Sequence, residues 1–155
     1  MNHQAIYHSK IGQFRIIEEE GYITSIQYIN APLQEQNECR SEVLVECIHQ
    51  LDDYFKGKRK QFTLPLCPKG TPFQKRVWQA LLAIPYGQTM TYQDIAKEVG
   101  NEKACRAVGM ANHCNPIPII IPCHRVLGKN QRLTGYALGI EKKQILLDLE
   151  KEHAL

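Results

Sequence analysis

The feature that most constrains the fold of this 155-residue chain is a change of patterning near residue 70. Before it, two runs rich in β-branched residues, 14–17 and 22–26, flank Glu19, Glu20 and Gly21, which predicts a β-hairpin. After it, apolar residues recur at helical spacing and helix-start signals repeat. The pattern predicts two domains, residues 1–68 and 69–155, with a linker at residues 67–70.

One helix is expected within the first domain. Ser41 can cap it, apolar residues follow at spacings of three and four, and Gly57 can end it. A short strand is expected at residues 62–64. The first domain is therefore expected to combine a β-sheet with a helix.

The second domain is expected to be mainly helical. Thr71, Pro72 and Gln74 give an N-cap, a proline at the first helical position and a capping box, for a helix that stops near residues 85–87. Residues 91–94 open another helix that ends at Gly100, and Asn101 is expected to cap a third, from 102 to about 112.

The two helices joined across Gly100 match a helix-turn-helix. This pattern is common in DNA-binding proteins, but simple core packing produces it as well. The predicted fold class is α/β: a small N-terminal β-sheet-plus-helix domain followed by a mainly helical C-terminal domain with a helix-turn-helix.

Composition narrows the classes of function. No apolar run approaches the roughly 20 residues that a membrane span needs, and the first residues lack the pattern of a signal peptide. A cytoplasmic location away from any membrane is therefore expected. Reduced thiols are expected rather than disulfides for the six cysteines, Cys39, Cys47, Cys67, Cys105, Cys114 and Cys123.

Charge is distributed unevenly, although the net charge is only +3. No acidic residue lies between Glu102 and Glu141. The same stretch holds five basic residues, namely Lys103, Arg106, Arg125, Lys129 and Arg132. A local positive field of this kind favours a polyanionic partner such as nucleic acid, and an ordinary solvated face is the alternative.

A cysteine beside a histidine is the strongest chemical signal. Residues 122–125 read Pro-Cys-His-Arg and follow an apolar run. The thiolate is the reactive form of cysteine, and a nearby His or Arg lowers the thiol pKa. Neighbouring strand residues point to opposite faces, so Cys123 and His124 need a turn to cooperate, and Pro122 favours one. A reactive thiol, a metal ligand and a buried space-filling cysteine all remain open.

Two more residues are candidates for this site. Asn115, which precedes a proline, is a natural turn former, and Glu150 on the last predicted helix is a carboxylate that could orient His124. The possible metal ligands are Cys105, His113, Cys114, Cys123 and His124. Zinc sites typically pair ligands two to four residues apart, and no Cys-x-x-Cys is present, so no metal is expected.

Together these residues resemble the methylated-DNA–protein-cysteine methyltransferases, also called O6-alkylguanine-DNA alkyltransferases. The signature is residues 115–126, Asn-Pro-Ile-Pro-Ile-Ile-Ile-Pro-Cys-His-Arg-Val, and similar motifs lie at 91–93, 106–109, 135–136 and 146–150. The resemblance extends from about Thr71 to Glu150. The first domain fits the family in size and strand–helix content, and the resemblance implies a ribonuclease H-like fold for it.

The resemblance implies DNA repair by irreversible, single-turnover transfer. Cys123 would take an alkyl group, mainly methyl, from O6 of guanine in duplex DNA, with O4-methylthymine as a further substrate. His124, through a water held toward Glu150, would remove the thiol proton. Asn115 would brace the turn, and Tyr92 would donate a proton or hydrogen bond to the departing guanine.

The resemblance also implies how DNA is held. Arg106 would take the place of the flipped nucleotide, from a recognition helix in the minor groove. The flipped base would contact Tyr136, Ala137 and Val126, and the DNA backbone would contact Gln93, Asn101 and Lys129. No cofactor is implied, and a monomer acting on double-stranded DNA that bears O6-alkylguanine is expected.

Two alternatives remain. One is an alkyltransferase-like protein that senses lesions or regulates transcription without productive transfer, and the other is a Cys-His hydrolase that binds no DNA. One departure from the family pattern concerns the pocket. Leu138 stands where relatives usually carry glycine, and its isobutyl group is expected to narrow the pocket or alter the loop.

Overall fold

The computed structural model describes residues 2–30, 41–133 and 136–154. Cys39 and Gly135, which entered the predictions above, lie outside the described residues. The chain divides into two compact units, Met1–Lys69 and Gly70–Leu155. Each unit has its own core and is described by itself.

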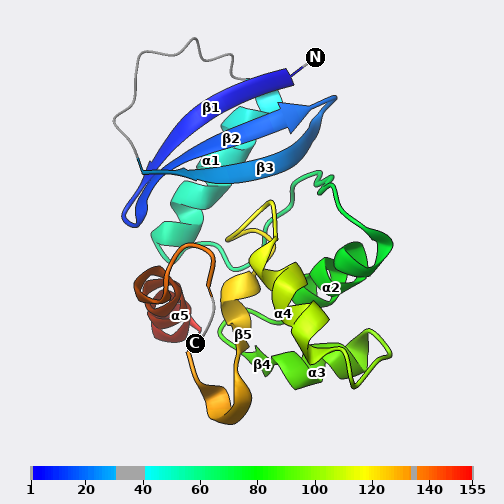
Figure 1. Ribbon diagram of the computed structural model, residues 1–155. Coiled ribbons are helices and arrows are strands. Elements are labelled where there is room, and N and C mark those ends of the chain that lie inside the picture. The colour runs from blue at the N-terminus through cyan, green and yellow to red at the C-terminus, as the bar shows by residue number, and fades with distance from the viewer. Residues whose placement is uncertain (1, 31–40, 134–135, 155) are drawn as a thin grey trace. The chain divides into compact units, whose positions relative to one another are not determined.

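An antiparallel sheet forms the first unit, in the order β1 (Asn2–Ser9), β2 (Gly12–Glu19) and β3 (Tyr22–Ile29) (Figure 1). The predicted hairpin is confirmed as β2 and β3, with a register shift between Ile17 and Glu18. Strand β1 was not predicted. Its buried residues Ala5, Ile6 and Tyr7 are consecutive, so the alternation that marks a half-buried strand is missing.

Helix α1 (Glu42–Phe55) packs against this sheet, as the apolar spacing predicts. The Ser41 side chain accepts a hydrogen bond from the backbone N–H of Leu44, at 3.3 Å. The helix ends as predicted, because Gly57 adopts a positive φ of 75° and its N–H donates to the Tyr54 carbonyl.

The predicted strand at residues 62–64 is wrong. Thr63 donates its backbone N–H to Oε1 of Gln50 at 2.9 Å, and Nε2 of Gln50 donates back to the Thr63 carbonyl at 3.3 Å. The buried Gln50 side chain thus takes the hydrogen bonds that a neighbouring strand would make. Pairing with the sheet comes slightly later, at a parallel bridge between Ile23 and Leu66.

The second unit is mainly helical. Helices α2 (Pro72–Leu82), α3 (Tyr92–Glu98) and α4 (Cys105–His113) pack against one another, and α5 (Ile140–His153) follows (Figure 1). Between α4 and α5 lie two 3₁₀ turns, η1 (Cys123–Arg125) and η2 (Lys129–Gln131). Two short strands, β4 (Met90–Thr91) and β5 (Val126–Leu127), pair in parallel.

Local capping explains where these helices begin. Thr71 forms the expected capping box with Gln74, and Thr91, where a helix was expected to open, forms a second capping box with Asp94. The prediction for the third helix is wrong at its start. Helix α4 begins at Cys105, because the Asn101 side chain instead accepts a hydrogen bond from the N–H of Lys103 within the inter-helix turn, at 3.2 Å.

Trp78 joins α2 to α4 in the core of this unit. Its indole Nε1 donates to the Ala111 carbonyl at 2.8 Å, and the ring is buried. The core also contains the buried side chains of Val77, Leu81, Ile95, Val108, Ile117, Ile121 and Leu146. The predicted fold class is confirmed. None of the helices in the described part of the chain has the length and apolar character that crossing a membrane demands.

Candidate active site

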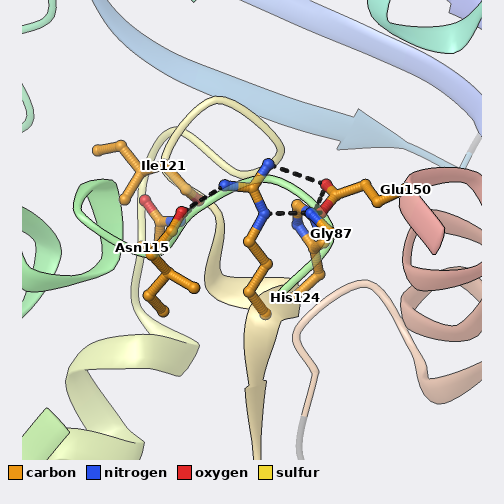
Figure 2. Close-up of polar contacts among 7 residues, drawn as sticks. Gly87, Asn115, Ile121, His124 and Glu150 are labelled. Carbon is orange, nitrogen blue, oxygen red and sulfur yellow. Dashed lines mark hydrogen bonds and ion pairs between the residues drawn. The ribbon is translucent and has the colours of Figure 1, made fainter. Parts of the chain in front are cut away.

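The loop before Cys123 is closed by the side chain of Asn115 (Figure 2). Its Nδ2 donates to the Ile121 carbonyl at 2.8 Å, and its Oδ1 accepts from the Ile117 N–H at 3.0 Å. Within the loop, Ile119 has a φ of 75°, a left-handed conformation that costs a β-branched residue about 1–2 kcal/mol. Asn115 therefore holds a strained, buried loop in one shape next to the thiol.

The predicted turn at the cysteine is present. Cys123 and His124 lie on η1, and both side chains are buried. The Cys123 carbonyl accepts a hydrogen bond from Nδ2 of Asn112 on α4, at 3.3 Å. The reactive turn is thereby attached directly to the second helix of the helix-turn-helix.

His124 contacts Glu150 directly. Nε2 of His124 lies 2.5 Å from Oε2 of Glu150, which reaches in from α5 (Figure 2). A carboxylate can only accept, so Nε2 carries the ring hydrogen when Glu150 is ionised. Nδ1 is then the basic nitrogen of the imidazole.

Glu150 receives several hydrogen bonds at once. Besides His124, it accepts from Nε and Nη2 of Arg125 at 2.7 and 3.0 Å, and from the Gly87 N–H at 3.3 Å. Burial alone would raise the carboxyl pKa, but the hydrogen bonds and charges of His124 and Arg125 outweigh it and lower the pKa to about 2. Glu150 is therefore ionised throughout the physiological range.

Arg125 does not belong to the basic surface that the sequence suggested. Its side chain is buried, and Nη1 donates to the Ile84 carbonyl at 2.8 Å. The guanidinium also lies 5.6 Å from the ring centre of Tyr86. The prediction that Arg125 contributes to a DNA-facing positive field is thus corrected. Its charge pairs with the Glu150 carboxylate inside the unit.

The expectation of a low thiol pKa is also corrected. Burial raises the pKa of Cys123 to about 11, and the hydrogen bonds of Asn115 and Tyr136 and the charge of Lys143 offset only part of this effect. Burial likewise lowers the pKa of His124, against the opposing effect of Glu150. The resting pair is therefore a neutral thiol beside a neutral imidazole, and the thiol needs a base to become a nucleophile.

Lys143 is a site residue that the sequence analysis missed. It is buried on α5, its Nζ donates to the Val126 carbonyl at 2.5 Å, and it lies 5.9 Å from the ring centre of Tyr136. Burial lowers its pKa to about 8, while the nearby Cys123 acts in the opposite direction. Helical spacing could have identified it from the sequence, because Lys143 and Glu150 are seven residues apart and therefore share a face of α5.

The residues expected to meet a substrate lie on neighbouring segments. Pairing of β4 with β5 aligns Thr91 with Leu127, which brings the start of α3, at Tyr92, beside the strand that contains Val126. Tyr136 is buried, and the exposed Ala137 follows it in a turn. Leu138, in the same turn, is half-buried.

The residues expected to meet DNA lie on the surface of the same unit. Exposed side chains are found at all four positions, Arg106, Gln93, Asn101 and Lys129. Arg106 shares the exposed side of α4 with Ala107, Met110 and His113. Gln93 is engaged locally, since its Nε2 donates to the Glu102 carbonyl at 3.1 Å and its Oε1 accepts from the Cys105 thiol at 3.0 Å.

Among the described residues, no group of three or more His, Cys, Asp and Glu side chains is arranged to hold a metal ion. The described thiols of Cys47, Cys67, Cys105, Cys114 and Cys123 are free. The fold and the site together define a class. The chain is an α/β protein of two units, in which a buried Cys-His-Glu array adjoins a helix-turn-helix.

Comparison with known proteins specifies this class. Residues 72–152 match the DNA binding domain of 6-O-methylguanine DNA methyltransferase, and residues 2–68 match its ribonuclease-like domain. The constitutive methylated-DNA–protein-cysteine methyltransferase of Bacillus subtilis is 47% identical over 159 residues, covering 97% of this chain and 96% of the relative. A Methanosarcina acetivorans relative of the same name is 46% identical over 153 residues, covering 94% and 96%.

Solved structures agree. The crystal structure of Mycobacterium tuberculosis O6-methylguanine methyltransferase has a TM-score of 0.88 at 39% identity, over 100% of this chain and 96% of that one. A structure of Mycobacterium tuberculosis OGT in complex with DNA has a TM-score of 0.89 at 40% identity, over 97% and 94%. The chain therefore belongs to the methylated-DNA–protein-cysteine methyltransferase family, as its motifs predict.

Proposed function

We propose that this protein repairs DNA by moving an alkyl group, mainly methyl, from O6 of guanine in a duplex to Sγ of Cys123. We propose O4-methylthymine as its second substrate. The observation that carries the proposal is the Cys123–His124–Glu150 array, in a chain whose relatives are named as methyltransferases over nearly its whole length.

In the proposed reaction, the Cys123 thiol gives its proton through a water to Nδ1 of His124, and the thiolate attacks the alkyl carbon. The sulfur–carbon bond forms as the carbon–O6 bond breaks, and the electron pair of the broken bond stays on guanine. Tyr92 stabilises the developing charge with a hydrogen bond or proton from its hydroxyl. The thioether is not reversed by cellular thiols, so each protein repairs one lesion.

Access to O6 requires that the nucleotide leaves the stack, at a cost of a few kcal/mol. In the proposal, Arg106 fills the vacated position and offsets part of that cost. The extruded base contacts Tyr136, Ala137 and Val126, while Gln93, Asn101 and Lys129 hold phosphates without reading sequence. The exposure of Arg106 and Lys129 on the unit that contains the thiol supports this arrangement.

Three further points belong to the proposal. The partner is double-stranded DNA bearing O6-alkylguanine, and the protein acts on it as a monomer. It works in the cytoplasm, where a reducing environment keeps Cys123 as a thiol.

The test is a transfer assay. The protein is incubated with duplex DNA containing O6-methylguanine labelled in the methyl group, and the label is located by peptide mass. The expected result is label on the Cys123 peptide, abolished by Cys123→Ala and retained by Cys67→Ala, an exposed thiol in the other unit. Binding without transfer would support the lesion-sensing alternative, and repeated turnover would contradict irreversible transfer.

A second assay tests Arg106. Arg106→Ala is expected to slow repair of duplex DNA far more than reaction with a free alkylguanine base, because only the duplex must be opened. Arg76→Ala, which removes an exposed arginine from α2, is the matched control. Equal losses on the two substrates would reject a role for Arg106 in extruding the nucleotide.

A further inference from the structure

Arg125 is buried beside the nucleophile but does not point its charge at it. Nε and Nη2 bind the two carboxylate oxygens of Glu150 at 2.7 and 3.0 Å, a bidentate arrangement that fixes the plane of the carboxylate. The remaining terminal nitrogen, Nη1, donates to the Ile84 carbonyl at 2.8 Å. The Tyr86 ring lies 5.6 Å from the guanidinium carbon. The arginine is thus held in place on several sides.

The geometry makes one carboxylate oxygen common to two partners. Oε2 of Glu150 lies 2.5 Å from Nε2 of His124 and 3.0 Å from Nη2 of Arg125. A buried carboxylate with no cation beside it would strongly favour the imidazolium form of a histidine. A guanidinium on the same carboxylate opposes that effect, because it repels a second positive charge on the ring.

We propose that Arg125 is a positioning residue for alkyl transfer: it aims Glu150 at Nε2 of His124 and balances the carboxylate charge, so that His124 rests as a neutral base able to take the Cys123 proton. This inference rests on the proposed function and specifies how the base of that reaction is kept ready. Arg125 touches neither thiol nor substrate in this proposal, and it acts through Glu150.

The charges around His124 predict in which direction its pKa changes when the Arg125 charge is removed. Glu150 raises the histidine pKa, while Arg125 and Lys143 lower it, in addition to the lowering by burial. The other titratable groups at this site are the Cys123 thiol and the Tyr86 and Tyr136 hydroxyls, whose pKa values are raised by burial, so all three are neutral at neutral pH. Removing the Arg125 charge leaves Glu150 less opposed, and His124 should then protonate at higher pH.

The direct test is an NMR titration of the His124 ring in the full-length protein without DNA. In Arg125→Gln the midpoint is expected to rise by about one pH unit or more, because the guanidinium charge is lost while a donor remains. Arg125→Lys keeps a charge and is expected to titrate close to the native protein. This measurement needs no substrate, so it stands or falls independently of whether alkyl transfer occurs.

The kinetic test is the pH dependence of single-turnover transfer from O6-methylguanine duplex DNA. In Arg125→Gln the acid limb should move to higher pH, which makes the rate on that limb about tenfold lower or more. Arg125→Lys should keep the limb in place but lower the rate at every pH, because the bidentate grip is lost. Arg76→Gln, an exposed arginine on α2, should change neither feature.

Two results would overturn the proposal. One is an unchanged His124 titration in Arg125→Gln, and the other is a native transfer rate in Arg125→Lys. If Arg125→Gln does not fold, as judged by circular dichroism, the Arg125→Lys rate decides. A merely structural arginine would lower the amount of folded protein without moving the pH profile of the folded fraction.

Discussion

At the scale of single residues, Glu150 determines the state of the site. It is buried, it is ionised, and it joins the His124 imidazole to the Arg125 guanidinium. Removing one partner of a buried ion pair typically costs about 3–5 kcal/mol, because the other charge is left uncompensated. The same carboxylate therefore contributes both to the stability of the second unit and to the chemistry proposed for it.

This arrangement predicts a loss of stability in acid. The carboxyl pKa of Glu150 falls from 4.5 to about 2 on folding, so its contribution is complete above pH 4.5 and is lost as the pH falls toward 2. The expected loss is about 3 kcal/mol. His124 acts in the same direction from higher pH, since burial lowers its pKa below 6.5. Urea unfolding measured as a function of pH checks this.

The matched control for the predicted loss of stability in acid lies on the same helix as Glu150. Glu152→Gln removes an exposed carboxylate from α5 and should leave the pH dependence intact. Glu150→Gln should start less stable and lose much of that dependence. Equal pH dependence in native protein and Glu150→Gln would contradict the role assigned to the buried carboxylate.

Lys143 should assist the thiol. Its charge lowers the Cys123 pKa against the effect of burial, so Lys143→Met is expected to slow methyl transfer about tenfold at neutral pH, where Lys143 is charged. Lys151→Met changes an exposed lysine on the same helix and should behave as native. An unchanged rate at neutral pH in Lys143→Met would show that this ammonium does not act on the thiol.

At the scale of elements, the turn at Gly87 fixes where α5 lies. Gly87 has a φ of 78°, its N–H donates to Glu150, and a Cβ there would meet the Cβ of Ala154 at 2.7 Å. The position of Glu150 therefore depends on the close approach of this turn to α5. The same turn follows Ile84, whose carbonyl accepts from Arg125.

Replacing Gly87 tests this packing. Gly87→Ala should destabilise the protein by about 1–3 kcal/mol more than Gly100→Ala. Gly100 has a similar φ of 82° but open space around its Cα, so it carries the same conformational penalty without the clash. Comparing the free energies of unfolding isolates the contact, and equal losses would contradict it.

Structural features that depend on residues close together in the sequence were predictable from it. Features that depend on contacts between distant residues were not. The capping box at Thr71, the helix start at Thr91 and the turn at Cys123 follow the predictions, because each depends on neighbours within three residues. The prediction of a strand at 62–64 failed because the side chain of Gln50, thirteen residues from Thr63, takes the hydrogen bonds that a neighbouring strand would make. Arg125 was misplaced for a similar reason, since Glu150 lies 25 residues further along.

At the scale of the whole molecule, the proposal requires DNA binding that depends on salt. The exposed basic residues of the second unit include Lys103, Arg106, Lys129 and Arg132. If these four neutralise phosphates, the logarithm of the binding constant should fall against log salt with a slope of about −3 to −4.

Single substitutions test the salt dependence. Lys129→Ala should reduce the steepness of the slope by about 1 while weakening binding uniformly across sequences. Lys58→Ala, which removes an exposed lysine from the first unit, is the control and should leave the slope unchanged. Affinity independent of salt would contradict phosphate binding by this surface.

The stoichiometry of transfer tests single-turnover repair by Cys123 most directly. Intact-protein mass is measured after incubation with a large excess of duplex DNA containing O6-methylguanine. Each molecule is expected to gain one methyl group, located on Cys123, and repaired DNA is expected never to exceed protein in molar amount. Repaired DNA in molar excess over protein, or a methyl group on any other residue, would contradict single-turnover repair by Cys123.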